Sequence, residues 1–432
     1  MKCMRVFVQS FGCSTNQADG AVLAGCLAKA GHELVGSISD ADLVVYNTCA
    51  VKGPTEDRMI DVCRRVSKGK KLVVAGCLPL INFERLLKEV KFDGVAGPAP
   101  GERIVELVDG VLSGEKVVAL DGSLQSKPAL TLPRVQQSSV VSVVPIGYGC
   151  VGSCAYCCTV FARGCLRSYA AEEIVERVAE DVRRGFREFW LTSQDTAAYG
   201  RDICTNLARL LHSLYRISQD FRVRVGMMTP NMVMDILDEF VDVFRDKRIF
   251  KFVHLPVQSG DDQILAQMRR SYSVDDFKEV VETFRHRFPE LALATDVICG
   301  FPGESKEAFD RTLRLIEEVK PDVVNVSKFF ARPKTAAAEM HADFVSPLEI
   351  KRRSSLAGAL AKQVAYQRNK QWAGWRGEIF IDEIGKPAGS WVGRNPAYKP
   401  VVVKSAENLL GETLNVKVTN AFPTYLEGEI VE

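Results

Sequence analysis

The chain has 432 residues, of which 47% are hydrophobic and 25% charged, and its formal net charge is +2 at pH 7. These values are typical of a soluble globular protein with roughly two to four domains, and so small a net charge neither supports nor excludes a nucleic-acid partner. The first residues lack the apolar core of a signal peptide, and no apolar stretch reaches the roughly 18 residues that span a bilayer. We therefore expect a cytoplasmic protein with no membrane partner.

Residues 1–112 alternate between strand-like apolar runs and helix-like periodic segments. Strands are expected at residues 5–9, 42–46 and 71–75, helices at 17–30, after Pro54 and at 82–90, and a further strand–helix unit over 92–112. Apolar strands that alternate with helices predict an α/β domain, an open parallel sheet covered by helices on both faces.

Thirteen cysteines occur in a chain expected in a reducing compartment, where disulfides are rare and cysteine groups indicate metal or catalytic sites. Each of the first three expected strands runs into a loop that carries a cysteine, namely Cys13, Cys49 and Cys77. Because the carboxyl ends of parallel strands meet at one edge of the sheet, we expect these three thiols to converge. Cys26 and Cys63 fall within helices and are expected to be core residues.

Residues 113–140 are rich in Ser, Gly, Pro and Gln, which predicts a linker. Residues 141–371 contain about six strand–helix units, which suit a partial (β/α)6 barrel better than a complete barrel of eight units. Its strands are expected near residues 142–148, 188–193, 222–227, 251–257, 291–299 and 323–330, and its helices include 171–184, 304–319 and a trailing helix at 347–371. Residues 372–432 change to short strands between turn residues, which predicts a small C-terminal β-barrel.

A C-x3-C-x2-C motif, formed by Cys150, Cys154 and Cys157, stands directly after the first barrel strand. Three thiolates can bind three irons of a [4Fe–4S] cluster and leave the fourth iron free to chelate S-adenosylmethionine. One electron from such a cluster cleaves the sulfonium to a 5′-deoxyadenosyl radical, which is the chemistry of the cofactor pair. The alternatives are three unrelated thiols or a zinc site, but zinc usually needs a fourth protein ligand and no histidine stands nearby. Cys158 could replace Cys157, although the spacing favours Cys157, and Cys158 and Cys165 are expected to be bystanders.

These motifs resemble those of the radical-SAM methylthiotransferase family over nearly the whole chain. In the amino-terminal part the resemblance rests on GCSTN at residues 12–16, NTC at 47–49 and GCLP at 76–79. It implies a methylthiotransferase domain over 1–112, the linker at 113–140, a radical-SAM barrel with its trailing helix over 141–371 and a TRAM-like β-barrel over 372–432. It also implies two [4Fe–4S] clusters, an auxiliary one held by Cys13, Cys49 and Cys77 and a radical-generating one held by Cys150, Cys154 and Cys157.

Polar groups at the carboxyl ends of barrel strands line barrel active sites. The family resemblance extends to three such stretches, at residues 190–202, 254–260 with 268–270, and 296–304. We expect S-adenosylmethionine to contact Gln194, Asp195, Gln258, Ser259, Arg269 and Asp296. Ordinary structural roles are the alternative, namely turn glycines, a helix-capping Glu304 and a solvated arginine. No catalytic residue beyond the cluster ligands is assigned.

Three substrate classes fit the family: isopentenyladenosine in tRNA, threonylcarbamoyladenosine in tRNA, and an aspartate of a ribosomal protein. Residues 47–57, 161–164, 168–169 and 191–196 are most similar to the threonylcarbamoyladenosine enzymes of archaea and eukaryotes. Lys52, Arg163 and Arg201 lie in loops near the strand carboxyl edges, and one of them could bind the carboxylate of the threonylcarbamoyl group.

The resemblance therefore implies conversion of N6-threonylcarbamoyladenosine-37 in tRNA to its 2-methylthio derivative, with two molecules of S-adenosylmethionine consumed. The reaction also needs a flavodoxin- or ferredoxin-like electron donor and a sulfur source. The rival from another class is a non-enzymatic iron–sulfur protein that binds RNA or carries electrons. The open iron argues against this rival, because an electron carrier is better served by four protein ligands.

The charge of the C-terminal domain gives no support to RNA binding. From Trp372 onward, six Lys and Arg residues stand against eight Asp and Glu residues, whereas phosphate binding needs a basic patch. Residues 351–353 are basic and could supply positive charge, but such a run is more often a solvated helix face. Trp372, Trp375 and Tyr398 could stack on bases but are expected to fill the barrel.

Overall fold

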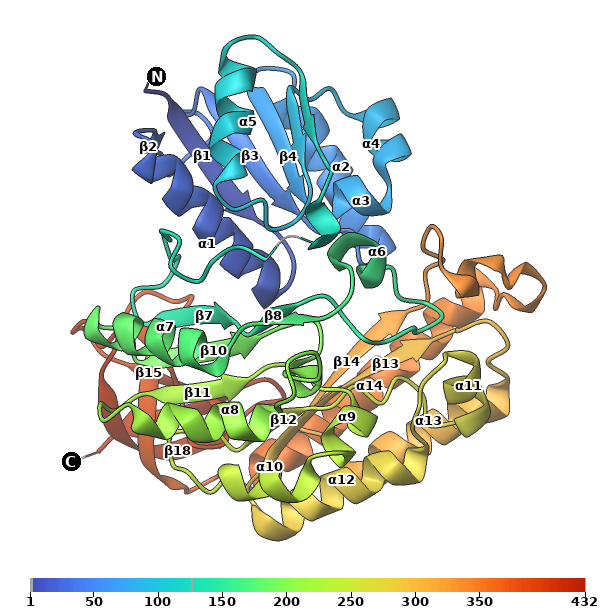
Figure 1. The fold of residues 1–432 in the computed structure, drawn as a ribbon. Coiled ribbons are helices and arrows are strands. Elements are labelled where there is room, and N and C mark those ends of the chain that lie inside the picture. Colours follow the sequence, from blue (N-terminus) through green and yellow to red (C-terminus); the bar gives the residue numbers. More distant parts are fainter. Residues whose placement is uncertain (1–2, 126, 432) are drawn as a thin grey trace.

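The amino-terminal part of the chain forms a six-stranded parallel sheet, drawn in blue at the top of Figure 1. The computed structural model describes residues 3–125 and 127–431. In spatial order the strands are β2 (Glu33–Leu34), β1 (Arg5–Ser10), β3 (Leu43–Thr48), β4 (Lys71–Gly76), β5 (Gly94–Ala96) and β6 (Val117–Ala119). The helices of this part are α1 (Ser14–Lys29), α2 (Gly53–Val66), α3 (Leu78–Ile81), α4 (Phe83–Glu89) and α5 (Arg103–Leu112).

Both faces of this sheet are buried, as its continuous apolar strands predict. Alternate residues of β3 point to opposite faces, so Val44 packs with Met59 of α2 while Val45 packs with Leu27 of α1. Helices α2 to α4 therefore cover one face and α1 with α5 the other. This two-sided packing leaves the carboxyl edge of the sheet open toward the rest of the molecule.

The segment expected as a linker is more ordered than its composition suggests. Its first part forms β6, which pairs in parallel with β5 and completes the sheet. Further on, Arg134 is buried and its guanidinium donates to a carboxylate oxygen of Asp181 at 2.6 Å. The Lys127 ammonium donates to the carbonyl oxygen of Ser168 at 2.8 Å. The segment thus joins the two domains while it packs against both.

The middle of the chain forms the expected partial barrel. Its six parallel strands follow one another in chain order: β7 (Val141–Pro145), β10 (Glu188–Thr192), β11 (Arg222–Val225), β12 (Phe252–His254), β13 (Ala292–Cys299) and β14 (Val323–Lys328). Two parallel bridges, Val223 with Ile249 and Met227 with His254, join the β11 and β12 halves. A short antiparallel ladder of β8 (Gly147–Tyr148) and β9 (Arg167–Ser168) follows β7.

Most helices of this part pack on the outside of the partial barrel above the largest apolar core, whereas α6 (Thr159–Arg163) lies between the barrel and the amino-terminal sheet. The others are α7 (Ala171–Arg183), α8 (Leu207–Ser213), α9 (Pro230–Met234), α10 (Leu237–Val243), α11 (Asp262–Gln267), α12 (Val274–Arg287), α13 (Lys306–Val319) and α14 (Pro347–Lys370). Within the described ranges, no helix has the length and apolarity that crossing a bilayer requires.

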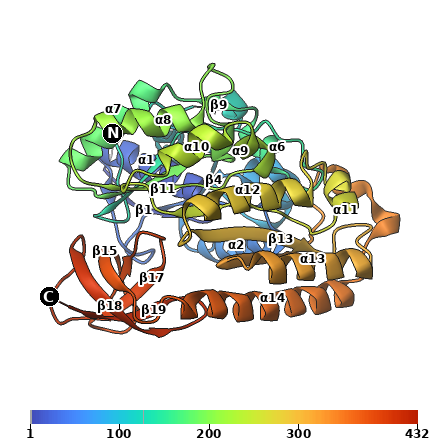
Figure 2. The same ribbon diagram turned by 90° about the horizontal axis from the view of Figure 1, so that it is seen from below.

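The last part of the chain is a closed five-stranded barrel, shown in red beside the end of α14 in Figure 2. Its strands are β15 (Arg376–Ile384), β16 (Ser390–Arg394), β17 (Pro400–Lys404), β18 (Thr413–Ala421) and β19 (Leu426–Ile430). Its core includes Phe250 and Phe252 of the partial barrel, so the two barrels share apolar packing. The buried Lys399 ammonium donates to Asp322 and to Asn369, each at 2.7 Å. The fold class expected from the sequence is confirmed.

A buried carboxyl group at the junction of the two barrels makes stability depend on pH. Glu188 is fully buried and accepts hydrogen bonds from the Trp190 indole at 2.6 Å and the Tyr398 hydroxyl at 3.1 Å. Burial, reinforced by the nearby carboxyl group of Asp382, raises the pKa of Glu188 to about 7. Because the folded protein holds this proton more tightly than the unfolded chain, its stabilising effect is complete below the ordinary glutamate pKa and is lost as pH rises through about 7.

We therefore expect Glu188→Gln to remove this loss. The free energy of unfolding of both proteins is measured in urea at pH 5 and at pH 8. The difference, variant minus wild type, should increase by about 2–3 kcal/mol from pH 5 to pH 8. A difference that stays constant over this range would contradict a raised pKa at this position.

Candidate functional site

Both cysteine triplets border one cavity between the amino-terminal sheet and the partial barrel. The cavity has a volume of about 690 Å³. Its cysteine lining comprises Cys13, Cys49, Cys77, Cys150, Cys154, Cys157 and Cys158. The carboxyl edges of the two parallel sheets meet here, because β1, β3 and β4 run into the first triplet and β7 runs toward the second. The structure thus joins two groups of thiols that the sequence keeps far apart.

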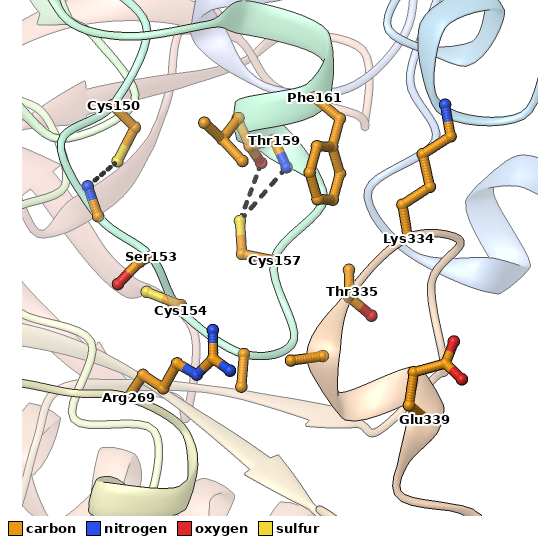
Figure 3. Close-up of a pocket in the computed structure, with 14 residues that line it drawn as sticks. Cys150, Ser153, Cys154, Cys157, Thr159, Phe161, Arg269, Lys334, Thr335 and Glu339 are labelled. Carbon is orange, nitrogen blue, oxygen red and sulfur yellow. Dashed lines mark hydrogen bonds between the residues drawn. The ribbon is translucent and has the colours of Figure 1, made fainter.

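The loop with Cys150, Cys154 and Cys157 also borders a second cavity of about 430 Å³, which Figure 3 shows. Gly149 starts the loop with φ +80, where an added Cβ would lie 1.9 Å from the carbonyl oxygen of Cys165. Only glycine fits such a close approach. The Cys150 sulfur accepts from the backbone N–H of Gly152 at 3.2 Å. The three cysteines therefore lie on a loop whose backbone turns tightly.

The triplet of Cys13, Cys49 and Cys77 is held by equally tight turns. Gly12 has φ +109, and an added Cβ there would lie 3.0 Å from the sulfur of Cys49. The amide of Asn16 donates to the carbonyl oxygen of Thr48 at 3.0 Å and so ties the start of α1 to the end of β3. All three cysteines border the larger cavity at the ends of β1, β3 and β4, where the sequence predicts them.

Burial keeps several of these thiols protonated in the absence of metal. It raises the pKa of Cys77 to about 12 and that of Cys150 to about 11, and it also raises the pKa of Cys49 and Cys157. Iron binding must therefore displace a proton from each of these four thiols.

Each triplet supplies three thiols, the ligand type of a [4Fe–4S] cluster. In the part of the chain that the structure describes, no three Cys, His, Asp or Glu side chains converge as ligands of a single metal ion would. A [4Fe–4S] cluster places each cysteine on a different iron, so its ligands surround a volume instead of meeting at a point. The residues present, three thiols on tight turns beside a cavity, fit that group.

Five of the six expected S-adenosylmethionine contacts line the larger cavity: Gln194, Asp195, Gln258, Arg269 and Asp296. Ser259 is the exception. It is fully buried, its hydroxyl accepts from the backbone N–H of Asp261 at 3.3 Å, and it does not belong to the cavity lining. Its role in the structure is thus to shape the turn after β12.

Hydrogen bonds hold the polar wall of the cavity in place. The Gln194 side-chain oxygen accepts from the backbone N–H of Gly149 at 2.6 Å, which links β10 to the loop of the second triplet. Asp195 caps a short 3-10 helix by accepting from the backbone N–H of Ala197 at 3.1 Å, and burial raises the pKa of its carboxyl group. Both residues therefore have structural partners before any cofactor is bound.

Asp296 and His254 form a polar pair in the same lining, with 3.1 Å between the carboxylate and the imidazole Nε2. Asn325 donates to the other carboxylate oxygen at 2.6 Å. Burial alone would raise the pKa of Asp296, but the hydrogen bonds from His254 and Asn325 keep it below its ordinary value. Asp296 is thus an anion at neutral pH.

The sequence prediction missed two features of the site. Arg270, the neighbour of the expected contact Arg269, donates to the Cys154 sulfur at 3.0 Å and to the Tyr272 hydroxyl at 2.9 Å. Arg269 has φ +57, so the backbone reverses there. A single sequence does not reveal that an arginine adopts this left-handed backbone conformation.

The second missed feature is a buried polar network that docks the two domains. Arg163 of α6 is almost fully buried, lies 2.7 Å from a carboxylate oxygen of Asp19 and donates to the side-chain oxygen of Asn16 at 2.5 Å. The Tyr148 hydroxyl donates to the other oxygen of Asp19 at 2.7 Å. Because Asn16 and Asp19 lie on α1 within two turns of Cys13, this network fixes the first triplet relative to the barrel.

The other cysteines lie apart from the two triplets or in the apolar core. Cys158 borders the larger cavity but is fully buried, and its thiol points to the carbonyl oxygen of Ala50 at 3.9 Å. Cys165 and Cys204 are exposed and do not border the cavity. Three further cysteines are buried in apolar clusters: Cys26, Cys63 and Cys299.

The residues considered for RNA contact have structural partners. Arg353 is buried beside Glu304, with 2.7 Å between guanidinium and carboxylate, so the basic run at 351–353 is not a fully solvated face. Trp372 packs edge-to-face on Trp375, and Tyr398 packs on Phe250, as expected for residues that fill the small barrel.

Comparison with known families agrees with this architecture. The chain matches the Radical SAM superfamily over residues 144–316, the Uncharacterized protein family UPF0004 over 5–97 and the TRAM domain over 376–431. Members of the Radical SAM superfamily use a [4Fe–4S] cluster and S-adenosylmethionine. In the solved structures, the radical S-adenosylmethionine methyltransferase TsrM from Kitasatospora setae, with cobalamin and a [4Fe–4S] cluster bound, has a TM-score of 0.56 at 13% identity, over 90% of this chain and 77% of that chain. At this identity the likeness concerns the fold alone.

Full-length relatives are much more similar. A probable threonylcarbamoyladenosine tRNA methylthiotransferase of Pyrococcus horikoshii is 40% identical over 99% of this chain and 100% of the relative. The threonylcarbamoyladenosine tRNA methylthiotransferase of Drosophila melanogaster is 36% identical over 99% of this chain and 78% of the relative. The chain therefore belongs to the radical-SAM methylthiotransferase family that includes the threonylcarbamoyladenosine tRNA methylthiotransferases of archaea and eukaryotes.

Proposed function

We propose that this enzyme converts N6-threonylcarbamoyladenosine-37 in tRNA to its 2-methylthio derivative. The observation that carries the proposal is the single cavity that both cysteine triplets border. Methylthio transfer needs one site that activates the base carbon and another that delivers sulfur, and both must reach the same atom. A shared cavity meets this requirement, and two relatives that match 99% of this chain are named threonylcarbamoyladenosine tRNA methylthiotransferases, one of them as probable.

We assign two cluster ligand sets from the geometry and the family resemblance. Cys150, Cys154 and Cys157 hold the radical-generating cluster, and Cys13, Cys49 and Cys77 hold the auxiliary cluster. When bound, the clusters would supply the electron that cleaves S-adenosylmethionine and a site for the sulfur that is methylated. With two such sets, the cofactors are two [4Fe–4S] clusters and S-adenosylmethionine.

The residues of the chain position and shield these groups. Arg270 donates to the sulfur of Cys154, and hydrogen bonds to ligand sulfurs are one of the means by which a protein tunes a cluster. Gln194 fixes the start of the same loop through Gly149. Asp195, Gln258, Arg269 and Asp296 provide polar groups for the amino acid and ribose parts of S-adenosylmethionine from the cavity wall. For Ser259 we propose no direct contact, because it lies outside that wall.

The proposed reaction needs partners that the chain does not contain. Reductive cleavage of S-adenosylmethionine takes one electron, for which we propose a flavodoxin- or ferredoxin-like donor. The inserted sulfur atom needs a separate source, and the macromolecular substrate is tRNA. This set of partners is consistent with the cytoplasmic location predicted from the sequence, which stays a prediction.

Mass spectrometry of tRNA nucleosides tests the proposal. The chain is expressed in cells that make threonylcarbamoyladenosine but lack their own methylthiotransferase, and 2-methylthio-threonylcarbamoyladenosine is expected to appear in digested tRNA. Expression of Cys150→Ala at the same level should give none of this nucleoside. Absence of the product with the intact, cluster-loaded chain would refute the proposed function.

A further inference from the structure

Several lysine and arginine side chains line the larger cavity, and not all of them are paired with an anionic group of the protein. Among the described residues, the Lys and Arg side chains that line it are Lys52, Arg163, Arg224, Arg269, Arg270, Lys328 and Arg332. Each one that lacks a fixed partner is a candidate to bind an anionic group of the substrate.

Four of these side chains are already engaged. Arg163 is paired with Asp19, and Arg332 with Glu56. Arg270 donates to Cys154 and Tyr272. The guanidinium of Arg224 lies 5.2–5.3 Å from the centroids of three aromatic rings, those of Trp190, Phe252 and Tyr398. Arg201, which the sequence also offered for this purpose, pairs with Asp235 and lies outside the cavity lining.

Lys52 differs from the remaining cations in its position. It follows Cys49 by three residues, precedes α2 and reaches across to β14, where its ammonium donates to the Ser327 hydroxyl at 2.7 Å. It forms no ion pair with any described residue within 4.0 Å. Arg269, by contrast, also borders the second cavity beside the loop of Cys154, as Figure 3 shows. The Lys52 ammonium thus has a neutral hydrogen-bond partner between the two domains, although its charge also helps to lower the pKa of Asp296.

Exposed apolar side chains stand next to Lys52. Val51 is 39% exposed and Phe330 is 36% exposed, and both line the cavity. Phe330 lies directly over Gly53, where an added Cβ would be 3.1 Å from the ring. An aromatic ring beside a lysine suits a flat base that bears an anionic substituent, because the base can stack while the anion meets the ammonium.

We propose that Lys52 and Ser327 bind the carboxylate of the threonylcarbamoyl group, while Phe330 and Val51 contact the adenine that carries it. This inference rests on the proposed function and names the residues that select its substrate. A carboxylate accepts from both the ammonium and the hydroxyl without displacing any ion pair in the described wall. An apolar substituent in the same place would offer the ammonium no acceptor, and the Asp296 carboxylate is already held by His254 and Asn325.

The test compares cluster-loaded Lys52→Met, Ser327→Ala and wild type in their binding to two tRNAs, one with threonylcarbamoyladenosine-37 and the same tRNA with unmodified adenosine-37. The wild type is expected to prefer the modified tRNA, and Lys52→Met should reduce this preference about 10- to 100-fold, since a hydrogen bond to a charged group is lost. Ser327→Ala should reduce it less. Lys52→Arg, which keeps the positive charge, should retain most of it.

The outcomes separate this inference from the proposed function. If Lys52→Met keeps the full preference, or if it weakens binding of both tRNAs equally, Lys52 does not read the carboxylate and the inference is overturned. If the wild type forms no methylthio product on the threonylcarbamoyl tRNA, the proposed function itself fails, whatever the effect of the variants. Iron content measured for each variant ensures that only cluster-loaded protein is compared.

Discussion

Anaerobic reconstitution with iron and sulfide is expected to load about eight irons per chain, as two clusters of four. Simultaneous replacement of Cys150, Cys154 and Cys157 by alanine should leave about four irons and abolish cleavage of S-adenosylmethionine, because the open iron that chelates it is lost. Replacement of the other triplet should also leave about four irons, keep cleavage and abolish methylthio product. Iron analysis and chromatographic detection of 5′-deoxyadenosine measure these outcomes.

The remaining cysteines supply matched controls. Cys158→Ala removes a buried thiol next to a proposed ligand, and Cys165→Ala removes an exposed one from the same region, so iron content should be unchanged in both. The same holds for alanine or serine at Cys26, Cys63, Cys204 and Cys299. If the variant without the auxiliary triplet binds four irons but cleaves no S-adenosylmethionine, the two triplets do not have separate roles.

The convergence of Cys13, Cys49 and Cys77 could be predicted from the sequence because it depends on one rule of parallel sheets. Strands β1, β3 and β4 all end at the same edge, so residues that follow them directly must lie close together. The C-x3-C-x2-C loop could be predicted because its chemistry is local in sequence. Both predictions needed no knowledge of how the domains pack.

The single cavity could not be predicted, because it depends on docking of the two domains. Docking relies on pairs such as Asp19 with Arg163, which are distant in sequence and which composition does not reveal. Strand β6 escaped prediction for a similar reason. It has only three residues, lies in a polar segment and gains its order from pairing with β5. Ser259 was expected at the cofactor because it follows a barrel strand, but the turn after that strand directs it into the core.

We also expect the enzyme to discriminate strongly between tRNAs that differ in the group on adenosine-37. Purified, cluster-loaded protein is offered tRNAs that carry threonylcarbamoyl-, isopentenyl- or unmodified adenosine-37, and the methylthio product is measured by mass spectrometry. The threonylcarbamoyl tRNA should react faster than the isopentenyl tRNA by about 10²- to 10⁴-fold, which corresponds to about 3–6 kcal/mol.

The physical reason lies in the polar cavity wall. The threonylcarbamoyl group adds a carboxylate, a hydroxyl and a ureido unit to the base, and polar side chains such as Lys52, Asn325 and Ser327 line the cavity that would receive it. An isopentenyl chain forms no hydrogen bond with them, so the water that they lose on binding is replaced only by the bonds that Lys52 makes to Ser327 and Asn325 to Asp296. Equal rates on the threonylcarbamoyl and isopentenyl tRNAs would refute this substrate assignment and leave the reaction type standing. Product formed only on an aspartate of a ribosomal protein would refute tRNA as the substrate, because the same radical chemistry would then act on a polypeptide.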